Sequence, residues 1–232
     1  KNILNKSDKK FMIVVGPCSI HDVEAAKEYA TRLKNLSSSL STNCLIVMRV
    51  YFEKPRTTIG WKGLINDPYL NDSYKINDGL KIARQLLVDI NKMDIPVACE
   101  FLDVFTPQYY ADLVTWGAIG ARTTESQLHR QLASGLSMPI GFKNNTNGDV
   151  ESAICAVLAV KSSHTFLGVT DQGKGCVVQT IGNQNDAIIL EDGADTASGA
   201  VLSQVGSITF TDIFQYNVAL LEDGLTTDSI LL

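Results

Sequence analysis

Short apolar runs alternate with longer amphipathic stretches along the first 190 residues of the chain. Apolar runs of about four to eight residues are typical of buried strands, and apolar positions three and four apart are typical of helices. The runs predict strands at Met12–Gly16, Leu45–Arg49, Val97–Glu100, Ala118–Arg122, Pro139–Lys143 and Ala187–Leu190. Because strands that alternate with helices form right-handed βαβ units, we expect a parallel sheet.

The predicted helices lie between these strands and are marked by capping residues or apolar stripes. The expected start signals are Asp22, Asp78 and Thr106-Pro107, and Gly117 is expected to end the third helix. Two further helices are indicated by the stripe Leu128, Leu132 and Leu136 and by the apolar segment Ala153–Val160.

A β-hairpin is predicted before the last of the six strands. His164–Thr170 and Cys176–Thr180 flank the turn sequence from Asp171 to Gly175. A Rossmann G-x-G-x-x-G motif is missing, and Gly173-Lys174-Gly175 lacks the P-loop spacing, which disfavours a nucleotide-binding sheet. We therefore expect a single α/β domain over residues 1–232, a TIM (β/α)8-type barrel that is incomplete, with an inserted hairpin.

The composition of the chain limits which classes of binding partner are expected. The net charge of −5 and the lack of a basic tract argue against nucleic acid or an anionic membrane. The apolar runs are far shorter than the about 20 residues of a membrane-spanning helix, and residues 1–10 contain no apolar signal core. We expect a cytoplasmic protein, and the five cysteines, without a C-x-x-C pair, are expected to be reduced.

Polar or reactive side chains follow five of the predicted strands. They are Cys18, Arg49, Glu100, Arg122 and Lys143. In a barrel, the carboxyl ends of the strands line one mouth, where polar residues usually serve chemistry. Lys54 and Arg56 add two more cations from the loop after the second strand. Because such cations suit phosphate and carboxylate oxygens, the substrate is expected to be small and polyanionic.

Four segments next to these strand ends resemble one enzyme family, the microbial type I DAHP (3-deoxy-7-phosphoheptulonate) synthases. The segments are Gly16–Asp22, Met48–Thr58, Gly120–Ser126 and Gly141–Asn144, and the resemblance extends over residues 1–190. It implies an enzyme that condenses phosphoenolpyruvate with erythrose 4-phosphate and releases phosphate. That reaction is the first step of aromatic amino-acid biosynthesis, the shikimate pathway.

The resemblance also implies roles for individual residues. Phosphoenolpyruvate would be bound by Arg49, Lys54, Arg122 and Lys143, and the aldose phosphate by Lys54, Pro55, Arg56 and Thr57. Lys54, as proton donor, and Glu100 are the implied catalytic residues. Cys18 would bind a divalent metal such as Mn or Fe, and a feedback aromatic amino acid would bind at Pro107, Gln108 and Ser137. A homo-oligomer is also expected.

The resemblance breaks after Leu190. Glu191-Asp192-Gly193-Ala194 stands where the family has Arg-Gly-Gly-Lys, whose arginine binds phosphate. The motifs that supply the histidine and glutamate metal ligands are not found. Similarity returns at Gly206–Asp212, which makes Asp212 a second candidate ligand for a metal whose binding the missing ligands would weaken.

Charge sets the last segment apart. Residues 191–232 contain seven acidic and no basic residues, so this acidic tail has a net charge of −7 and residues 1–190 one of +2. Two interpretations therefore remain open. The chain is a DAHP synthase, or it is an impaired or inactive relative that acts as a binding or regulatory subunit or is a defective gene product.

Overall fold

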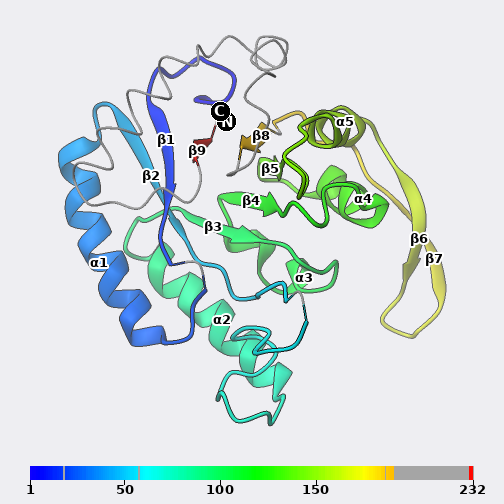
Figure 1. Ribbon diagram of the computed structural model, residues 1–232, viewed down its shortest axis with the longest axis horizontal. Coiled ribbons are helices and arrows are strands. Elements are labelled where there is room, and N and C mark those ends of the chain that lie inside the picture. The colour runs from blue at the N-terminus through cyan, green and yellow to red at the C-terminus, as the bar shows by residue number, and fades with distance from the viewer. Residues whose placement is uncertain (18, 57, 186, 191–229, 232) are drawn as a thin grey trace.

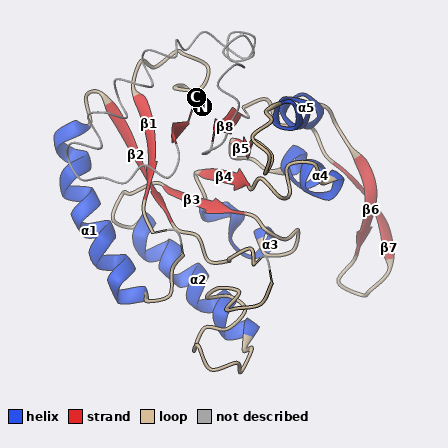
Figure 2. Ribbon diagram, viewed as in Figure 1, coloured by secondary structure: helices blue, strands red, loops and turns tan. Residues whose placement is uncertain are grey.

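The computed structural model describes residues 1–17, 19–56, 58–185, 187–190 and 230–231. Within them, six parallel strands lie side by side in sequence order and form a curled sheet (Figures 1 and 2). The strands are β1 (Phe11–Val15), β2 (Cys44–Arg49), β3 (Val97–Glu100), β4 (Trp116–Ile119), β5 (Ile140–Lys143) and β8 (Ala187–Leu190). A short strand that the sequence did not predict, β9 (Ile230–Leu231), pairs antiparallel with β8 and lies near β1.

Helices cover the outer side of the curl (Figure 2). They are α1 (Val23–Leu40), α2 (Ile76–Asn91), the short α3 (Pro107–Tyr110) with the 3-10 turn η1 (Ala111–Leu113), α4 (Gln127–Gly135) and α5 (Glu151–Val160). None of the helices in the described part of the chain combines the length and the apolar character that crossing a membrane requires.

The two faces of the sheet have different surroundings. Strand residues such as Met48, Val97 and Phe142 pack with the helices in the larger hydrophobic cluster. Their neighbours in sequence, Val47 and Ala98, belong to a smaller cluster with Trp116 on the inner face. Because side chains alternate between faces along a strand, the parity of each position decides which face it meets.

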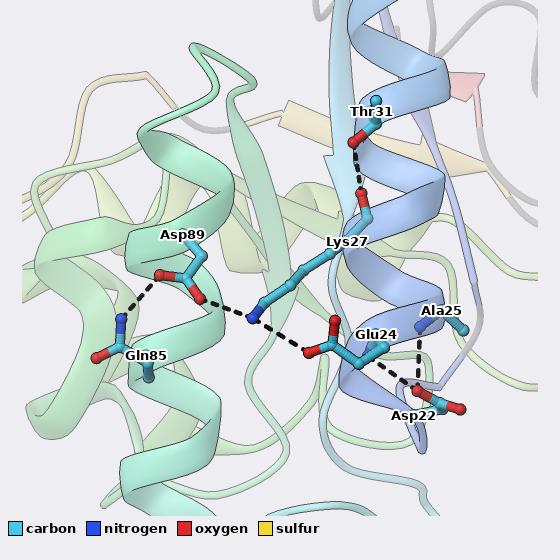
Figure 3. A network of polar contacts seen from close by, with 7 residues as sticks. All are labelled: Asp22, Glu24, Ala25, Lys27, Thr31, Gln85 and Asp89. Carbon is cyan, nitrogen blue, oxygen red and sulfur yellow. Dashed lines mark hydrogen bonds and ion pairs between the residues drawn. The ribbon is translucent and has the colours of Figure 1, made fainter.

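An ion-pair network joins α1 to α2 (Figure 3). Lys27 Nζ lies 3.1 Å from Asp89 Oδ2 and 3.3 Å from Glu24 Oε1. Gln85 donates to the other oxygen of Asp89, and the bonds from Gln85 and Lys27 lower the pKa of Asp89. At the start of α1, Asp22 Oδ1 accepts the backbone N–H groups of Glu24 and Ala25, which confirms Asp22 as the cap.

The predicted hairpin is confirmed as a separate two-stranded sheet, β6 (Thr165–Val169) with β7 (Gly175–Gln179). Its base is attached to α4, because the hydroxyls of Thr180 and Ser134 lie 2.7 Å apart. Its turn, residues 171–174, is exposed.

Two predictions in the β4 region are wrong. Gly117 lies inside β4 rather than at the end of a helix, and Arg122 lies in the turn after β4 rather than at the end of the strand. The packing explains Gly117: a Cβ there would lie 2.4 Å from Ile140 Cδ1 and 2.6 Å from the Phe101 ring. The glycine therefore makes room for side chains of the outer cluster.

Three helix predictions also differ from the structure. Of the predicted stripe, Leu132 and Leu136 are partly buried and pack against the larger cluster, whereas Leu128 is exposed. The helix α4 also buries His129 and Ala133, and the His129 ring is hydrogen-bonded to Ser126 Oγ and to Leu102 O. Thr106 does not cap α3 with its side chain; Asp103 Oδ1 accepts the N–H groups there. The second helix begins at Ile76, two residues before Asp78.

Candidate active site

Arg49, Glu100 and Lys143 are the last residues of β2, β3 and β5. The carboxyl ends of parallel strands meet at one edge of a sheet, so the three residues share that edge. Arg49 and Glu100 are two residues after Val47 and Ala98, so they lie on the same face of the sheet as those two residues. Lys143 directly follows Phe142 of the outer cluster, so it lies on the opposite face from Phe142. All three positions therefore belong to the inner face, as the sequence led us to expect.

Glu100 and Lys143 meet across β4, the strand between them. Lys143 Nζ lies 3.7 Å from Glu100 Oε1, and the two side chains are only 10–11% exposed. Gly120, the residue that follows β4, permits this approach, since a Cβ on Gly120 would lie 2.5 Å from Glu100 Oε1. The pair places a carboxylate and an ammonium group side by side at the edge of the sheet.

Arg49 is held at the end of β1. Its Nε donates to the carbonyl oxygens of Gly16 and Pro17, each at 3.1 Å, and its guanidinium lies 5.4 Å from the centre of the Tyr51 ring. The residue is buried.

Lys54, Pro55 and Arg56 lie in a loop that closes on itself. Its ends are joined by the bridge between Glu53 and Gly63 and by the bond from Lys54 N–H to Lys62 O. Arg56 is exposed, and its Nε donates to Trp61 O at 2.7 Å. Pro55 is exposed as well, and Thr57 lies outside the described residues.

Arg122 is exposed in a turn that is fixed by Thr124. The Thr124 hydroxyl is buried and makes hydrogen bonds to Gly120 O and Lys143 O, at 3.1 and 2.7 Å. Arg130 Nε donates to the Thr124 carbonyl at 3.0 Å. These bonds attach the turn to the end of β5, on the same edge as Lys143.

The three candidate regulatory residues come from two segments. Pro107 is buried at the start of α3, Gln108 follows it and is exposed, and Ser137 is exposed beyond the end of α4. The segments that carry them are connected through α4, because His129 Nε2 is hydrogen-bonded to Leu102 O.

The described residues do not fit a metal site, because no three His, Cys, Asp or Glu side chains among them are grouped to hold an ion. Both candidate ligands, Cys18 and Asp212, fall outside the described part of the chain, as does Glu191. We derive no chemical step through a metal.

Two residues of this region were not singled out by the sequence. Thr124 is fully buried, and Glu53 is buried directly before Lys54. Glu53 stands inside the Met48–Thr58 segment, but a single acidic residue in a polar loop carries no signal of burial.

The fold and the site define an α/β protein with a parallel sheet. Positively charged side chains lie at the edge of the sheet where the carboxyl ends of the strands meet. The sequence matches the DAHP synthetase I family over residues 1–213, so the match extends beyond Leu190 and includes Asp212. The chain belongs to this family.

The relatives and the solved structure described here carry the same enzyme name. A phospho-2-dehydro-3-deoxyheptonate aldolase of Haemophilus influenzae is 60% identical over 192 residues, which is 83% of this chain and 53% of the relative. A Phe-sensitive enzyme of that name from Escherichia coli is 60% identical over 83% of this chain and 55% of its own length. The solved structure of the Francisella tularensis protein of that name has a TM-score of 0.80 at 60% identity and covers 83% of this chain and 57% of its own. The chain spans about half the length of the relatives it matches.

Proposed function

We propose that this chain is a 3-deoxy-7-phosphoheptulonate synthase and that its curled sheet is part of a (β/α)8 barrel. The observation that carries the proposal is the set Arg49, Glu100 and Lys143 at one sheet edge, in a chain 60% identical to relatives named for this product. The substrates would be phosphoenolpyruvate and erythrose 4-phosphate.

For this reaction the site must bind two phosphorylated substrates and supply a proton to the aldehyde oxygen. The enol methylene carbon of phosphoenolpyruvate bonds to the aldehyde carbon, the aldehyde oxygen takes a proton, and water replaces the phosphate. In the proposal Arg49, Lys54, Arg122 and Lys143 bind phosphoenolpyruvate, and Lys54 also donates the proton. The Lys54–Thr57 segment binds the aldose phosphate, and Glu100 acts beside Lys143.

The electrostatics of the edge support this assignment. Cations on inner-face strand ends and the adjoining loops would attract both substrates, and buried arginine is suited to oriented binding of carboxylate or phosphate. The hydrogen bonds of Arg49 to two carbonyls fix its orientation before an anion arrives. The divalent metal, bound by Cys18 and Asp212, remains part of the proposal on the resemblance alone.

Regulation and assembly extend the proposal. Relatives from Escherichia coli are named Phe-sensitive and Trp-sensitive. We infer that an aromatic amino acid binds near Pro107, Gln108 and Ser137, and that the chain forms a homo-oligomer in the cytoplasm.

Calorimetric titration with phosphoenolpyruvate tests the site. The wild-type chain should bind, and Arg122→Ala should bind about tenfold or more weakly, since hydrogen bonds to charged groups contribute about 1.5–3 kcal/mol. Arg32→Ala is the matched control, because Arg32 is exposed on α1 and pairs with Glu28. Equal affinity in the two variants, or no binding by the wild type, would show that these positions do not form the substrate site.

A further inference from the structure

The side chain of Thr124 joins the turn after β4 to the end of β5. The residue is fully buried. Its hydroxyl oxygen lies 2.7 Å from Lys143 O and 3.1 Å from Gly120 O, and both carbonyls accept from it. A hydroxyl has one proton to donate, and the shorter distance is an ordinary O–H···O length, so the bond to Lys143 O is the main one. This bond connects two segments that are 19 residues apart in the sequence.

The Thr124 bond extends the connection between β4 and β5 beyond their backbone pairing. The parallel register of the two strands ends at Ile119 and Phe142, and Lys143 is one residue further along β5. On its other side, Lys143 is paired with Ile189 of β8. A side chain from the turn therefore holds the last residue of β5, at the edge of the sheet where the candidate site lies.

The turn itself is built on the carbonyl of Gly120. The backbone N–H groups of Thr123 and Thr124 both donate to Gly120 O, at 3.0 Å. Arg130 Nε donates to Thr124 O at 3.0 Å, and Ser126 caps α4 directly after the turn. These bonds do not use the Thr124 hydroxyl, so the turn and the start of α4 should still form when that hydroxyl is removed.

Residues of the candidate site lie at both ends of this connection. Arg122 is in the turn, two residues before Thr124, and Lys143 supplies the carbonyl that accepts the bond. Gly120, at the start of the turn, is the position over which the Glu100 carboxylate approaches Lys143. The hydroxyl therefore fixes the turn relative to the buried ion pair.

We propose that Thr124 is a positioning residue: its hydroxyl holds the turn that carries Arg122 against the end of β5, and so sets the spacing between Arg122 and Lys143. A ligand with a carboxylate and a phosphate group needs its cations at a fixed spacing, and cations that are fixed in advance lose less conformational entropy on binding. The bond to Lys143 stands independently of the chemistry of the site. The effect on phosphoenolpyruvate rests on the proposed function.

Hydrogen exchange on the full chain, without substrate, tests the bond. Thr124→Val keeps the branched shape and loses the hydroxyl, so protection of the amides of Thr123, Thr124 and Ser126 should fall about fivefold, the size expected for one hydrogen bond. Thr124→Ser keeps the hydroxyl and should keep most of the protection. Protection in Thr124→Val equal to that in the wild type would overturn the proposal.

Thr31→Val is the matched control. The Thr31 hydroxyl also donates to a carbonyl, Lys27 O at 2.9 Å, but it lies exposed on α1 (Figure 3). The same chemical change there should leave the exchange of the turn and the affinity for phosphoenolpyruvate as they are in the wild type.

Calorimetric titration with phosphoenolpyruvate tests the effect on the site. Thr124→Val should bind about fivefold more weakly than the wild type, and Thr124→Ser should restore most of the affinity. When Arg122→Ala is already present, Thr124→Val should cost clearly less, because one of the two cations whose spacing it sets is gone. Two losses that simply multiply would overturn the positioning role.

The two experiments separate this inference from the proposed function. If the wild type does not bind phosphoenolpyruvate, the proposed function fails, and the exchange results alone decide whether Thr124 holds the turn. If the wild type binds and Thr124→Val binds as tightly, the proposed function stands and the positioning role of Thr124 is overturned.

Discussion

Gly120 is the residue that lets the charged pair at the sheet edge form. Glu100 and Lys143 come from strands that are not neighbours, and their contact crosses the end of β4. Because Gly120, directly after β4, has no Cβ, the Glu100 carboxylate can lie over this position and contact Lys143. The sequence contains this information only as a glycine after an apolar run, which is common and does not reveal its neighbour.

Gly120→Ala is expected to displace the Glu100 carboxylate at little cost in stability, because the one close atom, Glu100 Oε1, is the end of a flexible side chain. It should also weaken phosphoenolpyruvate binding, because Glu100 must move away from Lys143. Urea denaturation and calorimetry measure the two effects. Gly175→Ala is the control, since its Cβ would meet only Leu167 Cδ1 at an ordinary 3.5 Å. Unchanged phosphoenolpyruvate affinity in Gly120→Ala would contradict the expectation.

Cys18 is expected to be protected from alkylation by Mn²⁺ and to react once a chelator is added, because a metal-bound thiolate is not a free nucleophile. Mass-spectrometric mapping of labelled cysteines measures this. Cys155 is exposed and serves as the internal control that metal should not affect, whereas Cys44 and Cys99 are buried and should react slowly throughout. Equal labelling of Cys18 with and without metal would remove it from the proposed ligands.

At the scale of helices and strands, the sequence predicts strands better than helix faces. Val97–Glu100 is a strand with the predicted bounds, because a short apolar run between polar segments has few alternatives. The leucine stripe of α4 predicted the buried face at Leu132 and Leu136 but not at Leu128, which is exposed while His129 is buried. The bonds of His129 to Ser126 and Leu102 allow the polar ring to be buried, and Leu102 is distant in sequence.

Asp22→Ala is expected to lower the free energy of unfolding by about 1 kcal/mol, since the cap of α1 leaves two N–H groups without their acceptor. Asp22→Asn should keep most of the stability, because its side-chain oxygen can still accept. Chemical denaturation of both variants gives the comparison. A loss in Asp22→Asn equal to that in Asp22→Ala would show that charge, rather than the acceptor, matters.

At the scale of the whole molecule, strand order follows from the alternation of strands and helices, and the pairing at the far edge does not. β9 has two residues, too few for any periodic signal, and its place beside β8 depends on the rest of the fold. The candidate site likewise has one part that the sequence predicts and one part that it does not. Its strand-end cations follow from local pattern and resemblance, whereas the contact of Lys143 with Glu100 joins two strands that are distant in the sequence.

The 232-residue chain made as it stands is expected to condense the two substrates far more slowly than the Phe-sensitive Escherichia coli relative. It spans about half of that relative's length, and it has Glu191 where the family resemblance places an arginine against phosphate. Like charges at about 4 Å repel by about 4 kcal/mol at an effective dielectric constant near 20. A phosphate-release assay with Mn²⁺ should show a gain for Glu191→Arg.

Two results would contradict that expectation. Turnover by the wild-type chain at the rate of the relative would show that its 232 residues are sufficient for the reaction. An unchanged rate in Glu191→Arg would show that the charge at this position does not limit the reaction.

The hairpin of β6 and β7 has a practical consequence for protein engineering. It forms its own sheet, its turn is exposed, and a Cβ on Gly173 would meet nothing within 4 Å. Exposed loop tips of this kind tolerate inserted sequence. A tetracysteine tag or a small fluorescent reporter placed in the 171–174 turn would therefore label the protein and leave the parallel sheet and its cationic edge intact.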